Sequence, residues 1–118
     1  MKRPMATYNA FDVVVVPFPF IEASQTKKRP AVILSCAKQF NLEASAYVMA
    51  MITSAAHTPW PCDLEISDLI SAGLPVKSIM RMKLFTIDQR LIQRQLGTLS
   101  KKDQFNLKSI LKKLLPQN

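Results

Sequence analysis

Residues 13–16 are an uninterrupted run of valines, flanked by Phe11 and Phe18 and closed by Pro17 and Pro19. β-Branched side chains suit the buried, pleated surface of a sheet and proline ends a strand, so this run predicts a short buried strand. It is also far shorter than the roughly 20 apolar residues of a membrane-spanning helix. We therefore expect a fold built around a sheet and no membrane partner.

Other segments also have the composition of strands. Short apolar runs that end at polar or proline-containing stretches predict strands at residues 30–35, 47–53 and 63–66. Residues 77–87 alternate only loosely, because Ser78 and Arg81 interrupt the apolar rhythm, and they predict one bent strand or two short ones. The polar stretch from Pro19 to Lys28 is long enough to be a functional loop.

Two helices are expected. Ser67 can cap a short helix through Leu69 and Ile70 that stops at Gly73, and Gly97 should end the stretch over residues 90–96. Ser100 and Asp103 have the spacing of a capping box. An apolar stripe at helical spacing then predicts an amphipathic helix that packs on the sheet and ends at Pro116, with Leu107, Ile110, Leu111, Leu114 and Leu115 on the stripe. The fold class is β-rich α+β.

The length of 118 residues fits one domain over residues 1–118, of which residues 1–9 are expected to be flexible. A net charge of +8 makes a polyanion the default partner, although such charge can also serve solubility alone. Cys36 and Cys62 stand far apart, which fits reduced thiols in the cytoplasm. With His57 as the single histidine, a zinc site would be hard to assemble, so we expect no metal.

Arg29 lies where the polar loop meets a predicted strand, and Pro30 restricts it to an extended conformation. A planar guanidinium suits two-point binding of phosphate, so Arg29 is a candidate phosphate ligand. Thr53 and Ser54 place two hydroxyls at the end of another predicted strand. These hydroxyls could bind phosphate oxygens beside Arg29 or simply satisfy the strand end.

Loop residues supply further candidates. His57 has the only side chain here that titrates near neutral pH and could act as an acid or base, although a lone loop histidine is usually a bystander. Trp60, between two prolines, could stack an RNA base or anchor the core. Gln25, Lys27 and Lys28 could contact RNA or simply be solvated.

Several blocks, in order, resemble the MazF/PemK family of toxins from type II toxin-antitoxin systems, over roughly residues 10–115. The blocks are Phe-Asp-Val-Val-Val-Val-Pro-Phe-Pro-Phe at 11–20, Lys-Arg-Pro-Ala-Val-Ile-Leu-Ser at 28–35, Ala-Met-Ile-Thr-Ser at 50–54, Ala-Gly-Leu-Pro at 72–75, Ser-Ile-Met-Arg at 78–81, Lys-Leu-Phe-Thr-Ile-Asp at 83–88 and Leu-Gly-Thr-Leu-Ser at 96–100. Their order and spacing together are more specific than any single block.

The resemblance implies an SH3-like antiparallel barrel of the CcdB/MazF type, with short helices and a C-terminal amphipathic helix. It also implies a homodimeric mRNA interferase that inhibits growth by cutting single-stranded RNA without a metal or other cofactor. Arg29 and Thr53 would be the catalytic pair, joined by Arg81, and the products would carry 2′,3′-cyclic phosphate and 5′-hydroxyl ends. An acidic antitoxin would be the partner, and operator DNA would be bound only by the toxin–antitoxin complex.

The chain departs from the family pattern at two positions. Some members carry an aspartate two residues after the arginine that corresponds to Arg81, whereas Lys83 stands there in this chain, so the general base stays open among His57, Arg81 and Arg29. Phe11 replaces the usual glycine of a turn. Two alternatives to the ribonuclease are a CcdB-like gyrase poison and a catalytically degenerate homologue that only binds nucleic acid and antitoxin.

Overall fold

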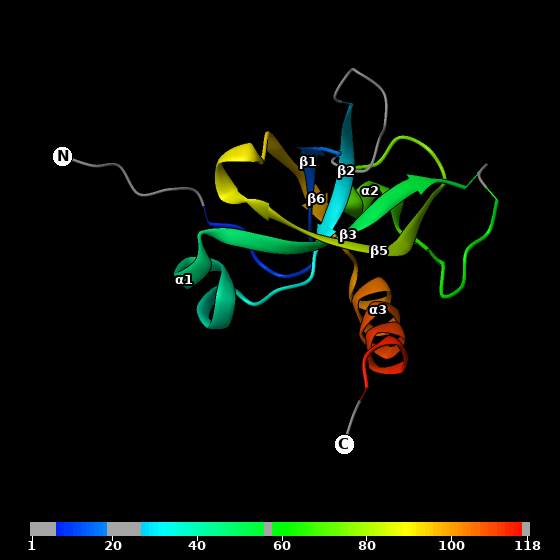
Figure 1. Ribbon diagram of the computed structural model, residues 1–118. Coiled ribbons are helices and arrows are strands. Elements are labelled where there is room, and N and C mark those ends of the chain that lie inside the picture. The colour runs from blue at the N-terminus through cyan, green and yellow to red at the C-terminus, as the bar shows by residue number, and fades with distance from the viewer. Residues whose placement is uncertain (1–6, 19–26, 56–57, 117–118) are drawn as a thin grey trace.

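A computed structural model describes residues 7–18, 27–55 and 58–116. Six antiparallel strands form one curled sheet, a half-barrel, in the order β4-β5-β3-β2-β1-β6 (Figure 1). The strands are β1 (Asp12–Pro17), β2 (Lys28–Ile33), β3 (Ala46–Ser54), β4 (Leu64–Glu65), β5 (Ser78–Asp88) and β6 (Arg94–Thr98). The expected antiparallel, barrel-like β-rich fold is thus confirmed. The segments from Pro19 to Thr26, at positions 56–57, and the first residues of the chain lie outside the described residues.

The predicted strands are all present, with bounds that shift by a few residues. The loosely alternating segment at 77–87 is one continuous strand, β5. Its pairing register with β3 shifts between Ala50 and Met51, so that Ala50 lies opposite Leu84 and Met51 lies opposite Arg81. This irregularity, and not a strand break, explains why the apolar alternation fails around Met82.

Alternate residues of the central strands face two separate cores. Val13, Val32 and Ile52 belong to one core, which α2 and α3 cover, while Val14, Ala31 and Met49 belong to the core on the opposite face of the sheet. This is why the valine run is apolar throughout instead of alternating. The β1 strand is buried on both of its faces.

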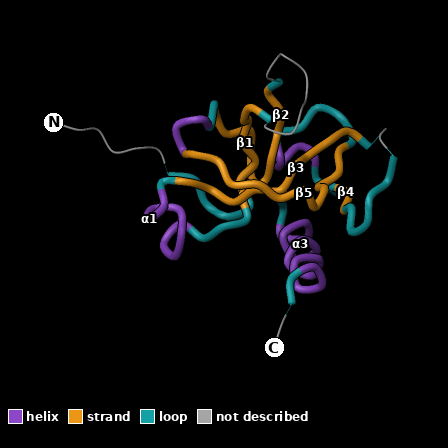
Figure 2. Tube along the Cα trace, viewed as in Figure 1, coloured by secondary structure: helices purple, strands orange, loops and turns teal. Residues whose placement is uncertain are grey.

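The helical elements, drawn in purple in Figure 2, are α1 (Leu42–Ala44), α2 (Leu69–Ala72) and α3 (Lys101–Leu114). Of these, α2 and α3 pack on one face of the sheet. A π-helical turn, Ala37–Asn41, precedes α1, and a 3-10 turn, Gln89–Leu91, follows β5. The turn before α1 could not be predicted from the sequence, because no side chain caps it. Among the described residues, no helix is long and apolar enough to cross a membrane.

Two expectations about the short helix and its surroundings need correction. Asp68, not Ser67, caps α2, since its carboxylate accepts a hydrogen bond from the Ser71 amide. Gly73 ends α2 as predicted, with a φ of 76°. Gly97, predicted to end a segment, lies inside β6, where a Cβ would come within 2.2 Å of the Ser71 carbonyl oxygen. The glycine permits a close approach of β6 to α2.

The C-terminal helix forms as predicted and packs on the core through Leu107 and Leu111, but its C-terminal end does not. Ser100 caps it by accepting a hydrogen bond from the Asp103 amide. Leu107 is fully buried, whereas Leu114 and Leu115 are exposed, because α3 runs away from the sheet toward its C-terminal end (Figure 1). The apolar stripe therefore extends beyond the core that the sheet offers.

Candidate active site

The candidate site is a pocket of about 210 Å³ at one end of the sheet, where β2 begins, β3 ends and β5 begins. It is lined by Arg29, Pro30, Ile52, Thr53, Ser54, Leu74, Pro75, Val76 and Ser78. The β2–β3 ladder extends from Ile33 opposite Met49 to Ala31 opposite Met51. Continuing that register by two residues places Arg29 across from Thr53, so the pocket opens where these two strands cease to pair.

Arg29 occupies the wall of this pocket with its guanidinium against an aromatic ring. Its Cζ atom lies 6.0 Å from the centroid of the Phe18 ring, at the limit for a cation–π contact. Its Nε–H is buried and has no hydrogen-bond partner within the described residues. A buried donor without a partner costs about 1–3 kcal/mol. Such a donor beside a pocket is a ready binding group for an anionic ligand.

The two hydroxyl residues predicted beside Arg29 are in the same pocket. Thr53 is buried and Ser54 is half-buried at the end of β3. Ser78 faces Ser54 across the β3–β5 ladder, but its hydroxyl already donates to the Val76 carbonyl at 2.7 Å. The structure therefore brings Arg29, Thr53 and Ser54 together around one small pocket.

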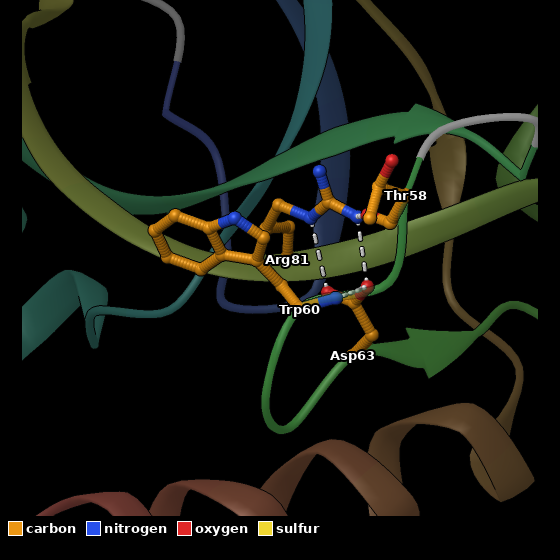
Figure 3. A network of polar contacts seen from close by, with 4 residues as sticks. All are labelled: Thr58, Trp60, Asp63 and Arg81. Atoms are coloured by element: carbon orange, nitrogen blue, oxygen red, sulfur yellow. Dashed lines mark hydrogen bonds and ion pairs between the residues drawn. The ribbon is translucent and has the colours of Figure 1, made fainter.

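Arg81 is placed differently from Arg29. Its guanidinium donates to Asp63 through Nε at 3.1 Å and through Nη2 at 2.8 Å, and Nη2 also donates to the Thr58 carbonyl at 2.8 Å (Figure 3). Both side chains of the ion pair are about nine-tenths buried. The hydrogen bond to Asp63 raises the pKa of Arg81. The hydrogen bond from Arg81 likewise lowers the pKa of the Asp63 carboxyl.

The Arg81–Asp63 pair places a carboxylate beside Arg81, although no acidic residue follows Arg81 closely in the sequence. The residues after Arg81 offer Met82 and Lys83, and the acid that reaches the guanidinium comes instead from the segment before β4. Asp63 could not be recognised as a site residue from the sequence, because 18 positions separate it from Arg81. The pairing of β4 with β5, together with the fold of the segment before β4, brings the two side chains into contact, and no short spacing could reveal that.

The remaining candidates do not line the pocket, or they lie outside the described residues. Lys27 and Lys28 are exposed at the start of β2. Trp60 is 44% exposed, so the possibility that it anchors the core is wrong. Lys83 Nζ lies 4.7 Å and Arg81 Cζ 5.8 Å from the centroid of the Trp60 ring. The predicted contacts of Gln25 and His57 concern residues outside the described part of the chain.

Comparison with known proteins identifies the family. The profile described as "PemK-like, MazF-like toxin of type II toxin-antitoxin system" matches residues 9–115. The chain therefore belongs to this toxin family, as its motifs indicated. The match does not favour the CcdB-like alternative. A search among curated proteins gives no match.

Solved structures agree with this assignment at the level of the fold. MazF from Deinococcus radiodurans aligns with a TM-score of 0.72 and 19% identity, covering 93% of this chain and 97% of that one. A MazE–MazF complex from the same organism has a TM-score of 0.71 at 18% identity, with 97% and 100% covered. An endoribonuclease solved with its cognate antitoxin from a mycobacterial species has a TM-score of 0.70 at 15% identity, with 94% and 99% covered.

Proposed function

We propose that this toxin is an endoribonuclease that cuts single-stranded mRNA without a metal ion or other cofactor. The observation that carries the proposal is the Arg29 guanidinium, whose buried Nε–H has no partner within the described residues and which lines a pocket with Thr53. An endoribonuclease of the same fold supports the activity. The net charge of +8 favours a polyanionic substrate.

The chemistry follows from what such a pocket can bind. An RNA 2′-oxygen attacks the adjacent phosphorus, the bond to the 5′-oxygen breaks, and a 2′,3′-cyclic phosphate and a 5′-hydroxyl remain. The negative charge that grows on the phosphorane is stabilised by Arg29, while the Thr53 hydroxyl donates to a non-bridging oxygen and orients the phosphate. Ser54, Lys27 and Lys28 extend the RNA contacts on either side.

The proton acceptor for this step must be an unprotonated group. Arg81 is held by Asp63 and its pKa is raised, and Arg29 acts as a charged guanidinium, so both are poor bases. We assign the proton transfers to His57, whose imidazole would accept the 2′-hydroxyl proton and return a proton to the departing 5′-oxygen. We place Gln25 among the RNA contacts. Both His57 and Gln25 belong to the segments next to Arg29 and Thr53 in the chain.

The proposed partners follow from the same net charge of +8. An acidic antitoxin would bind and inhibit the toxin, as the mycobacterial endoribonuclease was solved with its cognate antitoxin. We propose a cytoplasmic homodimer that binds operator DNA only in the complex with that antitoxin. Mixing the toxin with its antitoxin should stop RNA cleavage, and cleavage should persist when an unrelated protein of equal charge is added.

The test of the activity is incubation of the purified protein with a long single-stranded RNA in EDTA, followed by analysis of the fragment ends. We expect fragments with 5′-hydroxyls and 2′,3′-cyclic phosphates, and no cleavage of a DNA of the same sequence, because DNA lacks the attacking 2′-hydroxyl. Uncut RNA that is nevertheless retained by the protein would replace this proposal with the degenerate, binding-only homologue.

A further inference from the structure

The segment 58–63, which precedes β4, is held by a closed set of hydrogen bonds around one carboxylate. Asp63 accepts from the Trp60 amide through Oδ2 at 2.8 Å, and the Asp63 amide donates to the Trp60 carbonyl at 3.2 Å. The same carboxylate receives both hydrogen bonds from Arg81, whose Nη2 also binds the Thr58 carbonyl (Figure 3). Arg81 thus ties both ends of this segment, the Thr58 carbonyl and the Asp63 carboxylate, to β5.

This arrangement leaves the indole ring of Trp60 exposed to solvent. An exposed tryptophan loses the burial that its large apolar surface would gain in a core. Prolines at 59 and 61 restrict the backbone on both sides, so little conformational freedom remains to be lost on binding. The Lys83 ammonium lies over this ring in a cation–π contact, 4.7 Å from its centroid. Together they offer an exposed aromatic ring with a cation against it.

The Trp60 ring lies against Arg81, and Arg81 shares a face of the sheet with Thr53 of the pocket. Arg81 lies opposite Met51 in the β3–β5 ladder, and Met51 is two residues before Thr53 on the same strand. Side chains two residues apart share one face of a strand, and they are about 7 Å apart. Arg81 and Thr53 therefore lie on the same face of the sheet. A ligand that reaches from the pocket along this face meets Trp60.

We propose that Trp60 stacks an unpaired base of the RNA close to the scissile phosphate and that Lys83 binds a neighbouring phosphate. Trp60 and Lys83 together form a base-stacking platform. Asp63 is the positioning residue that fixes this platform through Arg81. The inference rests on the proposed function for the identity of the ligand. Aromatic rings stack bases of single strands, and cations beside them contact the backbone. A bound base here makes Arg81 part of substrate positioning and leaves proton transfer to other groups.

The test uses the single tryptophan of the chain as its own probe. A short single-stranded DNA, which has no 2′-hydroxyl and stays uncut, is titrated while Trp60 fluorescence is recorded, and an abasic strand of the same length is titrated in parallel. We expect the base-bearing strand to quench the fluorescence and to bind tighter than the abasic one. Trp60→Ala, in which binding is followed by anisotropy of a labelled strand, should weaken only the base-bearing strand, by about tenfold.

Asp63→Asn tests the positioning role. Removing a negative charge should by itself strengthen the binding of both strands equally. The affinity alone is therefore not informative. A loss of the preference for the base-bearing strand over the abasic strand shows that the platform is lost. Asp88→Asn is the matched control, because Asp88 also makes two hydrogen bonds to an arginine side chain, Arg90, but at an exposed site. We expect it to keep the preference. Asp63→Glu, which retains the carboxylate, should recover part of it.

The outcomes separate this inference from the proposed function. Quenching by the base-bearing strand in a protein that never cuts RNA would remove the nuclease and leave the platform standing. Equal affinity for both strands in the wild-type protein, or an unchanged preference in Trp60→Ala, would overturn the platform. An unchanged preference in a folded Asp63→Asn would overturn the role of Asp63. The Trp60 result stands even if that variant does not fold, because the Trp60 side chain is exposed.

Discussion

The Cζ atom of Arg29 lies 6.0 Å from the centre of the Phe18 ring, and Phe18 in turn packs edge-on against Phe85, with centroids 5.6 Å apart. Phe18 is buried and directly follows β1. The Arg29 guanidinium therefore packs against Phe18, which belongs to the core formed by Val14, Ala31 and Met49. Its direction depends on packing as well as on the restriction from Pro30.

Replacing Phe18 with leucine should separate packing from the support of Arg29. We expect Phe18→Leu to lower the free energy of unfolding by about 1 kcal/mol and to slow RNA cleavage about tenfold, because the cation–π contact is lost. Phe85→Leu removes a ring from the same cluster and is the matched control. Equal slowing in both variants at equal stability would show that the Phe18 ring gives Arg29 no specific support.

Asp103 should make stability depend on pH. Burial acts to raise its pKa, but hydrogen bonds from the Ser67 amide and hydroxyl and from the Asp68 amide outweigh burial, and the pKa is lowered. The stability from these bonds is complete above the ordinary aspartate pKa of about 3.9 and is lost as pH falls through the lower folded value. Thermal unfolding between pH 5 and 2, as test conditions, should show a shallower fall of the melting temperature with decreasing pH for Asp103→Asn than for wild type. Parallel curves would contradict this assignment.

Phe11 has a φ of 76°, the conformation that the family's usual glycine adopts without strain. Its ring also packs on the core and lies 5.4 Å from the Lys108 ammonium. Phe11→Gly and Phe11→Ala lose the same ring, but alanine keeps the strain. We expect the glycine variant to be more stable than the alanine variant by about 1 kcal/mol in urea unfolding. The reverse order would mean that the turn relaxes in these variants.

Gly97 should tolerate no larger residue. A Cβ there would lie 2.2 Å from the Ser71 carbonyl oxygen and 2.7 Å from the Ala72 carbonyl carbon, so β6 and α2 must move apart. We expect Gly97→Ala to lower the free energy of unfolding by about 3 kcal/mol. Ser71→Ala, which removes only the hydrogen bond from the Ser71 hydroxyl to the Thr98 carbonyl, should cost about 1 kcal/mol. Calorimetric melting of both variants checks the ranking.

Much of the sheet could be predicted because its strands carry local signals. The valine run and the apolar segments around Val32 and Met49 show which residues are buried, and Ser100 marks the start of α3. Gly97 was misjudged because glycine ends elements in many chains, and only the contact with α2 reveals its use here. The exposed end of α3 was missed for a similar reason, since periodicity shows an apolar face but not what covers it.

The candidate site was predictable in part. Arg29 and Thr53 could be paired because each lies at the end of a predicted strand, and the structure places both in one pocket. Asp63 could not be paired with Arg81, because the contact depends on how the segment before β4 folds back on β5. Contacts between distant segments depend on register, which residue type and spacing do not record.

The central claim, that Arg29 stabilises the phosphorane in an RNA-cutting pocket, is tested most directly by the rate of cleavage of a long RNA in EDTA by Arg29→Ala. Arg90→Ala is the matched control, because it removes the same charge from an exposed arginine. We expect Arg29→Ala to retain its fold and to lose cleavage by at least about a hundredfold, while Arg90→Ala cuts at nearly the wild-type rate. Cleavage by Arg29→Ala at the wild-type rate would contradict the account.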